Sequence, residues 1–287
     1  MWLILSLTAA LFTSFTDVLG KKVIGRCGAY VVVWGLNFFA MPFLYAAALT
    51  QPAPSLGPLF WSTLAVQGIV VVIASIFYFK AIEASDLSIT IPMLAFTPLF
   101  LLITSPLMLG EFPKPLGLWG ILLIVGGSYI LNIAQLRKGY LAPLKTLIKE
   151  KGPRYMLMVA LLYSIGANLD KIGVWQSSPL VWATAINTVL AIALGLVMLR
   201  KNSDASQRIR SGWKYLILLG VVNAVALIAN MGAIQLTLVP YVIAIKRLSV
   251  FMTLVSGFLI FKEKGYRERS IGALLMILGA AMISMAH

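Results

Sequence analysis

The sequence has little charge, one cysteine and one histidine. Only 11% of its 287 residues are Asp, Glu, Lys or Arg, whereas soluble domains carry about 25%. Hydrophobic residues make up 60% of the chain, more than a soluble core of this length buries. The composition therefore excludes a soluble enzyme or a soluble DNA-binding domain and predicts a membrane protein.

The scarcity of reactive residues excludes several chemistries. Cys27 is the one cysteine and His287, the last residue, the one histidine, so the sequence offers neither an internal disulfide nor a Cys–His pair. It contains no HExxH motif and no P-loop. We therefore expect no enzyme activity, no metal and no cofactor, and we expect any transport to draw on a gradient or on exchange.

Apolar runs as long as a membrane-spanning helix follow one another along the chain. They are continuous and rich in Leu, Ile, Ala and Gly, which favours helices over the alternating strands of a β-barrel. The expected spans are 2–20, 29–49, 58–79, 87–109, 116–136, 154–174, 179–199, 214–236, 240–261 and 270–286. The sequence thus predicts an all-α polytopic membrane protein with ten transmembrane helices.

The basic residues gather in alternate loops. The net charge is +14, and 19 of the 23 Lys and Arg residues follow the first, third, fifth, seventh or ninth span. Because cytoplasmic loops accumulate basic residues, we expect a prokaryotic-type plasma (inner) membrane with both termini non-cytoplasmic. These loops favour contact with membrane lipids and argue against a nucleic-acid partner, which needs a basic face on a soluble domain.

The two halves of the chain align with each other. We divide it into a first five-helix repeat at 1–136, a basic cytoplasmic linker at 137–153, either a surface helix or a solvated segment, and a second repeat at 154–287. An odd number of spans per half makes the second half insert upside down, with a binding site near the midplane. One chain then completes the cavity, so we expect a monomer. The aligned pairs are Ser14–Ser164, Lys21–Lys171, Asn37–Asn187 and, two positions farther on, Glu111–Glu263, Gly120–Gly272 and Gly127–Gly279.

The segments from Tyr78 to Leu131 and from Tyr241 to Ile283 resemble the two repeats of the drug/metabolite transporter (DMT) superfamily, specifically EamA-type permeases. Two features carry the resemblance: Pro92 and Pro98 in the fourth span, and Glu111 and Glu263 before glycine-rich helices. The resemblance implies ten helices in two inverted five-helix halves, a central cavity and alternating access. Family members export amino acids and other metabolites, and related branches exchange sugar phosphates or nucleotide sugars or import small cations.

The resemblance and the charge distribution differ on orientation. Well-known bacterial members are expected with both termini in the cytoplasm, whereas the basic loops of this chain place them outside. We follow the basic loops. The two glutamates are expected to cap the helix that follows each of them, Glu111 that of the first half and Glu263 that of the second, with a gating role as the less favoured alternative.

Two cations inside the ninth span are the first candidates for a binding site. A charge at a helix centre costs about 2.5–3.5 kcal/mol to insert and usually faces a cavity. Lys246 and Arg247 lie there, and Lys246 continues at helical spacing into Ser249 and Thr253. We predict a cationic cavity floor that binds phosphate or carboxylate, as in phosphate-exchanging relatives. Pairing with Asp17, Asp170 or Glu83 is the open alternative.

Polar groups in the first and sixth spans complete the candidate site. Asp17 and Lys21 share a helix face, so either they form a local ion pair or Asp17 relays a proton or cation. Polar residues of the sixth span either bind substrate or hold helices together. The candidates there are Tyr163, Asn168 and Lys171 for substrate and Asp170 for an ion pair.

The pattern predicts a secondary active transporter, a permease, exporter or exchanger, that works by alternating access. Its expected substrate is a small polar metabolite, anionic or zwitterionic: a phosphorylated compound, a carboxylate or an amino acid. Two alternatives remain open. One is a cation or drug transporter that uses Asp17 and aromatic side chains, and the other is a flippase that accepts a lipid phosphate.

Overall fold

A computed structural model describes residues 1–52, 54–85, 90–133, 150–201, 204–261 and 266–286. These residues form helices and their connections, with no strand among them. Seven of the helical segments are long and apolar enough to cross a membrane, and two shorter apolar helices, Pro115–Leu131 and Ile271–Ala286, accompany them. The prediction of an all-α polytopic membrane protein is therefore confirmed. Most of the predicted linker at 137–153, with its surface helix, lies outside the described residues.

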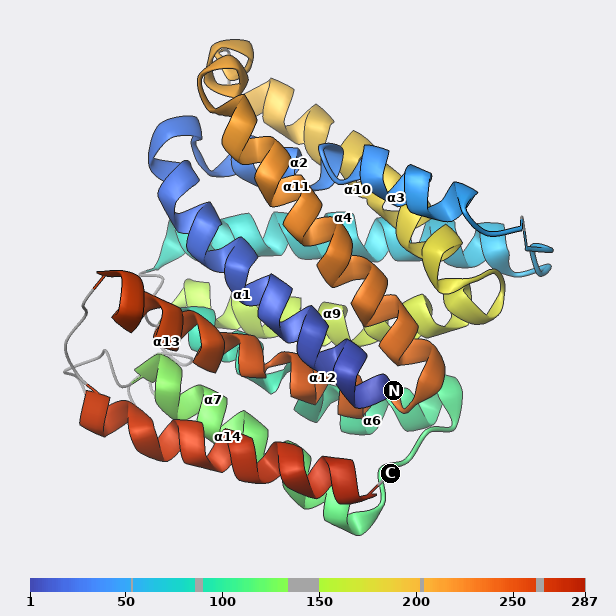
Figure 1. Cartoon of the computed structure of the whole chain (residues 1–287), viewed down its shortest axis with the longest axis vertical. Coiled ribbons are helices and arrows are strands. Elements are labelled where there is room, and N and C mark those ends of the chain that lie inside the picture. Colours follow the sequence, from blue (N-terminus) through green and yellow to red (C-terminus); the bar gives the residue numbers. More distant parts are fainter. Residues whose placement is uncertain (53, 86–89, 134–149, 202–203, 262–265, 287) are drawn as a thin grey trace.

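The helices lie side by side in one bundle (Figure 1). Those of the first half are α1 (Trp2–Cys27), α2 (Ala29–Phe38), α3 (Met41–Leu49), α4 (Phe60–Ala84), the 3-10 helix η1 (Ile91–Phe96), α6 (Thr97–Leu109) and α7 (Pro115–Ile133). Those of the second half are α9 (Lys151–Trp175), α10 (Pro179–Lys201), α11 (Ala205–Leu236), α12 (Val239–Lys246), α13 (Leu248–Phe261) and α14 (Tyr266–Ala286).

Several helices continue past the ends of the predicted spans. The helix α1 runs to Cys27 and α11 begins at Ala205, so part of the basic sequence is helical. An apolar run marks the part of a helix that matches the hydrocarbon core, and nothing prevents the helix from extending into the polar interface. Gly28, with a positive φ of 78°, separates α1 from α2.

Three predicted spans are interrupted. The span at 29–49 is divided between α2 and α3, that at 87–109 between η1 and α6, and that at 240–261 between α12 and α13. Proline follows the first residue of α3 and of α6, where it has no helical hydrogen bond to break. The third interruption carries no proline and falls at Arg247.

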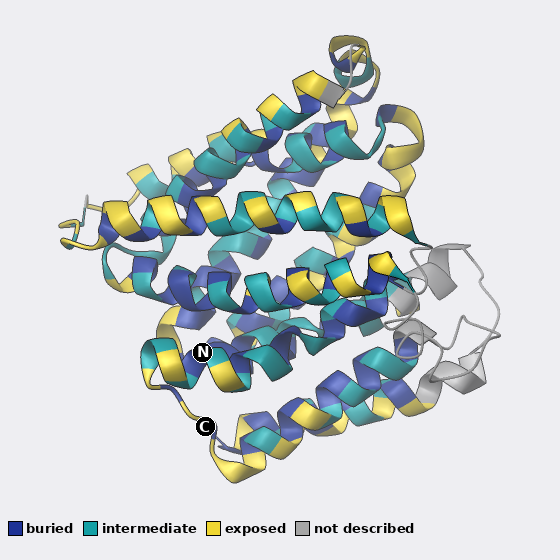
Figure 2. Ribbon diagram, turned by 180° about the vertical axis from the view of Figure 1, so that it is seen from behind, coloured by how far each residue is buried: buried dark blue, intermediate teal, exposed yellow. Residues whose placement is uncertain are grey.

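Large apolar side chains face outward along the bundle, as they do in a protein surrounded by lipid. Figure 2 shows exposed residues along the outer faces of the helices. Leu107, for example, is 80% exposed and Trp61 68% exposed. The side chains of Asp170 and Asn168, described below, are by contrast held between helices by hydrogen bonds.

The helices of the two halves pack against one another in matched pairs. The helix α1 packs on α11 and α4 packs on α9, while α2 packs on α10 and α7 on α14. Asn187 of α10 donates a hydrogen bond of 2.8 Å to the carbonyl of Asn37 in α2. Every one of these contacts therefore joins the first half of the chain to the second.

Glycines bring α7 and α14 into backbone contact. A Cβ atom added to Gly120 would lie 2.6 Å from the carbonyl oxygen of Gly279, and one added to Gly127 would lie 2.5 Å from that of Gly272. A Cβ atom added to Gly279 would lie 2.5 Å from the carbonyl oxygen of Gly120, and one added to Gly272 would lie 2.7 Å from that of Gly127. Because residue numbers rise along one helix as they fall along the other, α7 and α14 are antiparallel.

Candidate functional site

A cavity of about 380 Å³ lies in the middle of the bundle, between helices of both halves. Its walls come from α1, α4, α6, α9, α10, α11, α12 and α13. We call it the central cavity. Its polar lining residues are Thr13, Gln67, Thr97, Tyr163, Asp170, Asn230, Lys246, Arg247 and Ser249.

The two cations line the central cavity at the interruption between α12 and α13. Lys246 is the last residue of α12 and Arg247 follows it. A cation at this position is favoured by the negative end of the helix dipole. Arg247 donates a hydrogen bond of 2.8 Å from Nη2 to the hydroxyl of Thr97, the first residue of α6. The interruption in the ninth predicted span thus meets the interruption in the fourth.

Asp170 supplies a carboxylate to the same cavity. Its Oδ1 atom accepts a hydrogen bond of 2.9 Å from Gln67 Nε2 in α4 and another of 2.9 Å from Trp182 Nε1 in α10. Trp182 is fully buried, so its indole holds the carboxylate from the protein side. The cavity therefore combines two cations with one oriented carboxylate.

Three buried polar atoms of the cavity-lining residues have no hydrogen-bond partner in the described part of the protein. They are Gln67 Oε1, Asn230 Oδ1 and Arg247 Nε. The Gln67 amide is oriented by the bond from its nitrogen to Asp170, so the atom left over is an acceptor. Because buried polar groups are nearly always paired, these atoms favour a polar ligand or ordered water in the cavity.

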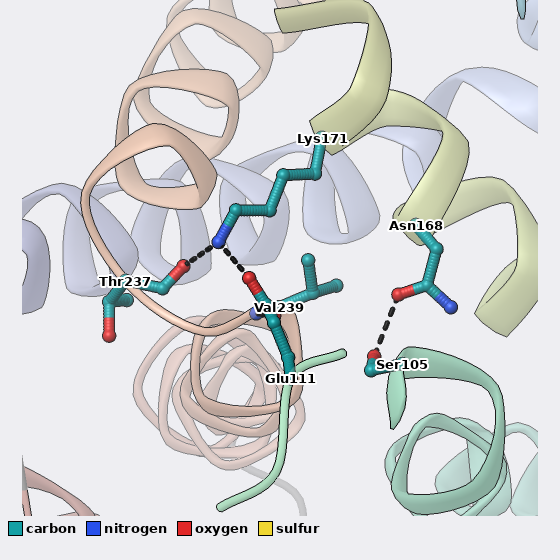
Figure 3. Close-up of polar contacts among 6 residues, drawn as sticks. All are labelled: Ser105, Glu111, Asn168, Lys171, Thr237 and Val239. Carbon is teal, nitrogen blue, oxygen red and sulfur yellow. Dashed lines mark hydrogen bonds and ion pairs between the residues drawn. The ribbon is translucent and has the colours of Figure 1, made fainter. Parts of the chain in front are cut away.

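The predicted residues Asn168 and Thr253 lie between helices, outside the lining of the central cavity. Asn168 is fully buried and accepts a hydrogen bond of 2.7 Å from Ser105 of α6 (Figure 3). It also donates one of 3.0 Å to Thr104 of the same helix. Thr253 donates to Ser14 at 3.1 Å and, more weakly, to Asp17 at 3.5 Å. The contacts of Asn168 correspond to the packing alternative that the sequence analysis left open for the sixth span.

The first-span pair also lies outside the lining of the central cavity. Asp17 and Lys21 are both exposed on α1, one helical turn apart. Tyr163 and Ser249, by contrast, are in the lining as predicted, together with Lys246, Arg247 and Asp170. The structure therefore brings five of the ten candidate residues into one cavity.

Lys171 lies in a buried ion pair with Glu111, away from the central cavity (Figure 3). Its ammonium also donates a hydrogen bond of 2.8 Å to the carbonyl of Thr237 at the end of α11. The expectation that Glu111 caps the helix following it is wrong in detail. Glu111 Oε2 accepts a hydrogen bond of 2.8 Å from the backbone N–H of Val239, so it caps α12 of the other half.

Sequence reasoning missed Gln67 and Thr97. Gln67 is a lone amide inside an apolar span, and the same kind of signal made Asn168 a candidate in the sixth span. Thr97 lies directly before Pro98, one of the residues that carry the family resemblance, so its place in the sequence could have drawn attention to it. Neither signal identifies a partner, because the hydrogen bonds to Asp170 and Arg247 come from helix packing.

The fold and the polar cavity define a multi-pass membrane protein with a buried polar site. The model of the EamA-like transporter family matches residues 1–133 and 151–285. The chain therefore belongs to this family, which is part of the DMT superfamily, and the resemblance noted in the sequence is confirmed. It is accordingly a membrane transporter of the DMT type, in a family of transporters rather than of enzymes.

Comparison with solved structures supports the fold. One crystal structure superposes with a TM-score of 0.79 at 17% sequence identity, over 99% of this chain and 96% of the other. At this identity the similarity concerns the fold alone. A comparison with curated proteins finds no match.

Proposed function

We propose that the chain is a secondary transporter of a small metabolite that carries an anionic group together with hydrogen-bond donors. The observation that carries the proposal is the charge pattern of the central cavity, where Lys246 and Arg247 share one space with Asp170. A planar guanidinium and a point-like ammonium suit a carboxylate or phosphate. An ammonium or hydroxyl group on the same substrate suits the carboxylate of Asp170.

The unpaired atoms support the same substrate class. Arg247 Nε needs an acceptor, whereas Gln67 Oε1 and Asn230 Oδ1 need donors. A carboxylate or phosphate supplies only acceptors. An amino acid, or a phosphorylated compound with hydroxyl groups, supplies both and therefore fits the cavity better than a simple anion.

Alternating access between two inverted five-helix halves is the mechanism that we propose. The predicted repeat exchanges Gly120 with Gly272 and Gly127 with Gly279, and this exchange maps the two close contacts between α7 and α14 onto each other. It also maps the α1–α11 contact onto the α9–α4 contact. Counting each interrupted segment as one crossing, the helices are compatible with ten crossings. The two mappings of helix contacts support a two-fold axis in the membrane plane.

We further propose a plasma (inner) membrane orientation with both termini outside the cytoplasm. Basic side chains lie at the C-terminal end of α1 and the N-terminal end of α11, away from the chain ends. A reporter fused after His287 tests the orientation: one that is active only outside the cytoplasm should be active. Activity of a reporter specific for the cytoplasm would reverse the assignment.

The substrate test is thermal stabilisation of the detergent-purified protein by phosphorylated metabolites, carboxylates, amino acids and quaternary ammonium compounds. A ligand at 100 times its Kd stabilises the folded state by about 2.7 kcal/mol. We expect stabilisation by a compound with an anionic group, and we expect Lys246→Ala to abolish it. Lys80→Ala, which removes an exposed lysine from the end of α4, is the matched control.

Asp170 supports one second candidate, a transporter of organic cations, because a carboxylate in the cavity also suits a cationic group. In that case quaternary ammonium compounds alone should stabilise the protein. Lys246→Ala would leave their effect unchanged or increase it, and Asp170→Asn would remove it. This outcome contradicts the anionic part of our proposal.

A further inference from the structure

A second pocket, of about 450 Å³, lies where α1 begins and α14 ends. We call it the terminal pocket. Lys171, Tyr241 and Ala286 are among the residues that line it. Tyr241 stacks on Trp2 at a ring-centroid distance of 6.4 Å, and Trp2 belongs to the same buried apolar cluster as Ala286. Figure 1 shows the two chain termini close together at one end of the bundle. The lining residues place the terminal pocket at that end.

The central cavity and the terminal pocket are lined by consecutive residues of α9. Asp170 lines the central cavity, whereas Lys171 lines the terminal pocket. Lys171 forms the buried ion pair with Glu111, and the side chains of the two residues are only 6% and 8% exposed. The wall of the terminal pocket thus holds a buried charged layer that lies one residue along α9 from the lining of the central cavity.

The layer ties together four segments from both halves (Figure 3). Glu111 lies in the connection from α6 to α7, Lys171 on α9, Thr237 after α11 and Val239 at the start of α12. We call these four residues the Glu111 junction. One carboxylate holds the ammonium with one oxygen and the N-terminal N–H of α12 with the other. Loss of this carboxylate would therefore release α9 and α12 together.

The helix α12 links the junction to the cations of the binding site. It has eight residues, from Val239 to Lys246, which corresponds to about 12 Å at 1.5 Å per residue. Glu111 neutralises its positive N-terminal end, and Lys246 lies in its last turn. A movement of the Glu111 junction would therefore displace α12 and, with it, Lys246 at the expected substrate site.

We propose that the Glu111 junction is the gate that closes the central cavity toward the terminal pocket, and that substrate crosses this layer when the ion pair opens. The inference rests on the proposed transport function. A buried ion pair suits a two-state gate, because separating the two charges is costly while they are buried and costs little once water enters and hydrates each of them. Lys171 already lines the terminal pocket, so its ammonium has space for hydration when it leaves Glu111.

Cysteine accessibility tests the gate without any substrate. The background is Cys27→Ser, since Cys27 is the one cysteine of the chain, and Ser249→Cys places a thiol in the lining of the central cavity. A charged, membrane-impermeant methanethiosulfonate is added from the side of the termini, identified by the reporter after His287. We expect slow labelling in this parent protein, and labelling faster by about tenfold or more after Glu111→Gln or Lys171→Met.

Two further variants keep the test decisive. The double variant Glu111→Gln, Lys171→Met leaves no unpaired buried charge, so it retains the fold better than either single variant and should also label fast. Asp204→Asn removes an exposed ion pair with Arg208 instead and should label at the parental rate. Parental labelling in a folded double variant overturns the gate. Fast labelling combined with no stabilising ligand in the thermal panel would keep the gate and reject the proposed substrate class.

Discussion

Arg247 donates a hydrogen bond of 2.8 Å to Thr97 where the two interrupted spans meet in the central cavity. This contact joins the second half of the chain to the first, and the two residues carry different chemistry. The first half supplies a hydroxyl and the second a guanidinium. The cavity is thus chemically asymmetric where the interrupted spans of the two halves meet.

Removing the Thr97 hydroxyl should weaken both the fold and the binding site. In Thr97→Val, Arg247 Nη2 loses its partner, and a hydrogen bond to a charged group contributes about 1.5–3 kcal/mol. We expect a lower unfolding temperature and a higher Kd for the anionic ligand. Thr16→Val is the matched control, because the Thr16 hydroxyl donates to the carbonyl of Phe12 within its own helix. Equal effects of the two variants would refute a special role of Thr97.

Neutralising Asp170 should change ligand selectivity more than stability. In Asp170→Asn the side-chain oxygen can still accept the bonds from Gln67 and Trp182, while the negative charge is lost. We expect affinity for an amino-bearing ligand to fall by about 10- to 100-fold, equivalent to roughly 1.5–3 kcal/mol for a charged hydrogen bond. Affinity for a ligand with an anionic group alone should stay constant or rise. Titrations monitored by tryptophan fluorescence measure both, and a parallel loss for both ligand types would argue against direct contact.

Alanine substitutions in α7 should distinguish the glycines by position. Gly120→Ala places a methyl group 2.6 Å from the carbonyl oxygen of Gly279, whereas Gly126→Ala meets no atom within 4 Å. Overpacking of this kind costs about 1–3 kcal/mol, so the unfolding temperature should fall for Gly120→Ala and stay constant or rise slightly for Gly126→Ala. Gly127→Ala should also lower the unfolding temperature, because its methyl group would lie 2.5 Å from the carbonyl oxygen of Gly272. Similar destabilisation by all three variants would contradict close packing of α7 on α14.

The ion pair of Glu111 should affect stability far more than the exposed pair does. Removing one partner of a buried pair costs about 3–5 kcal/mol, because the other charge is left unpaired. We expect that loss for Glu111→Gln or Lys171→Met, and part of it should be recovered when both are combined. Urea or thermal unfolding in detergent measures the difference, and additive effects of the two substitutions would exclude a direct interaction.

The exposed pair of Asp204 with Arg208 is the reference for that comparison. The hydrogen bond from Arg208 Nε, at 2.8 Å, holds the pKa of the Asp204 carboxyl below its usual value. A carboxyl whose pKa is lowered in the folded state stabilises the fold above its unfolded pKa, and this contribution is lost as the pH falls through the folded pKa. Asp204→Asn should therefore abolish only a small, acid-sensitive part of the stability.

The sequence predicts the membrane class, the family and half of the candidate site. Length and continuity of the apolar runs identify the helices, because a bilayer imposes both requirements. Lys246, Arg247 and Asp170 were predicted because charge inside a span is costly and therefore conspicuous. Which polar residues share a cavity depends on helix rotation and contact, so Lys171 and Asn168 could not be assigned to packing from their spacing.

The interruptions of the predicted spans were harder to predict from the sequence than the helices themselves. Proline accounts for the start of α6, but the residue types around Arg247 do not indicate that α12 ends at Lys246. The partner of Glu111 was missed because its carboxylate reaches a helix start 128 residues away in the sequence. Local capping rules consider the helix that follows, and here tertiary packing supplies a different one.

The contact between α7 and α14 includes direct backbone contacts at four glycines, and this has a consequence for any conformational change. A contact between a glycine and a carbonyl has no side-chain rotamers that a new position of the helices would select. It permits little sliding, because any closer approach meets hard backbone atoms and any separation leaves a void. Two spin labels placed across this pair should report the same distance with and without ligand. The α7–α14 pair would then be the stationary frame of reference against which the motion of the other helices is measured.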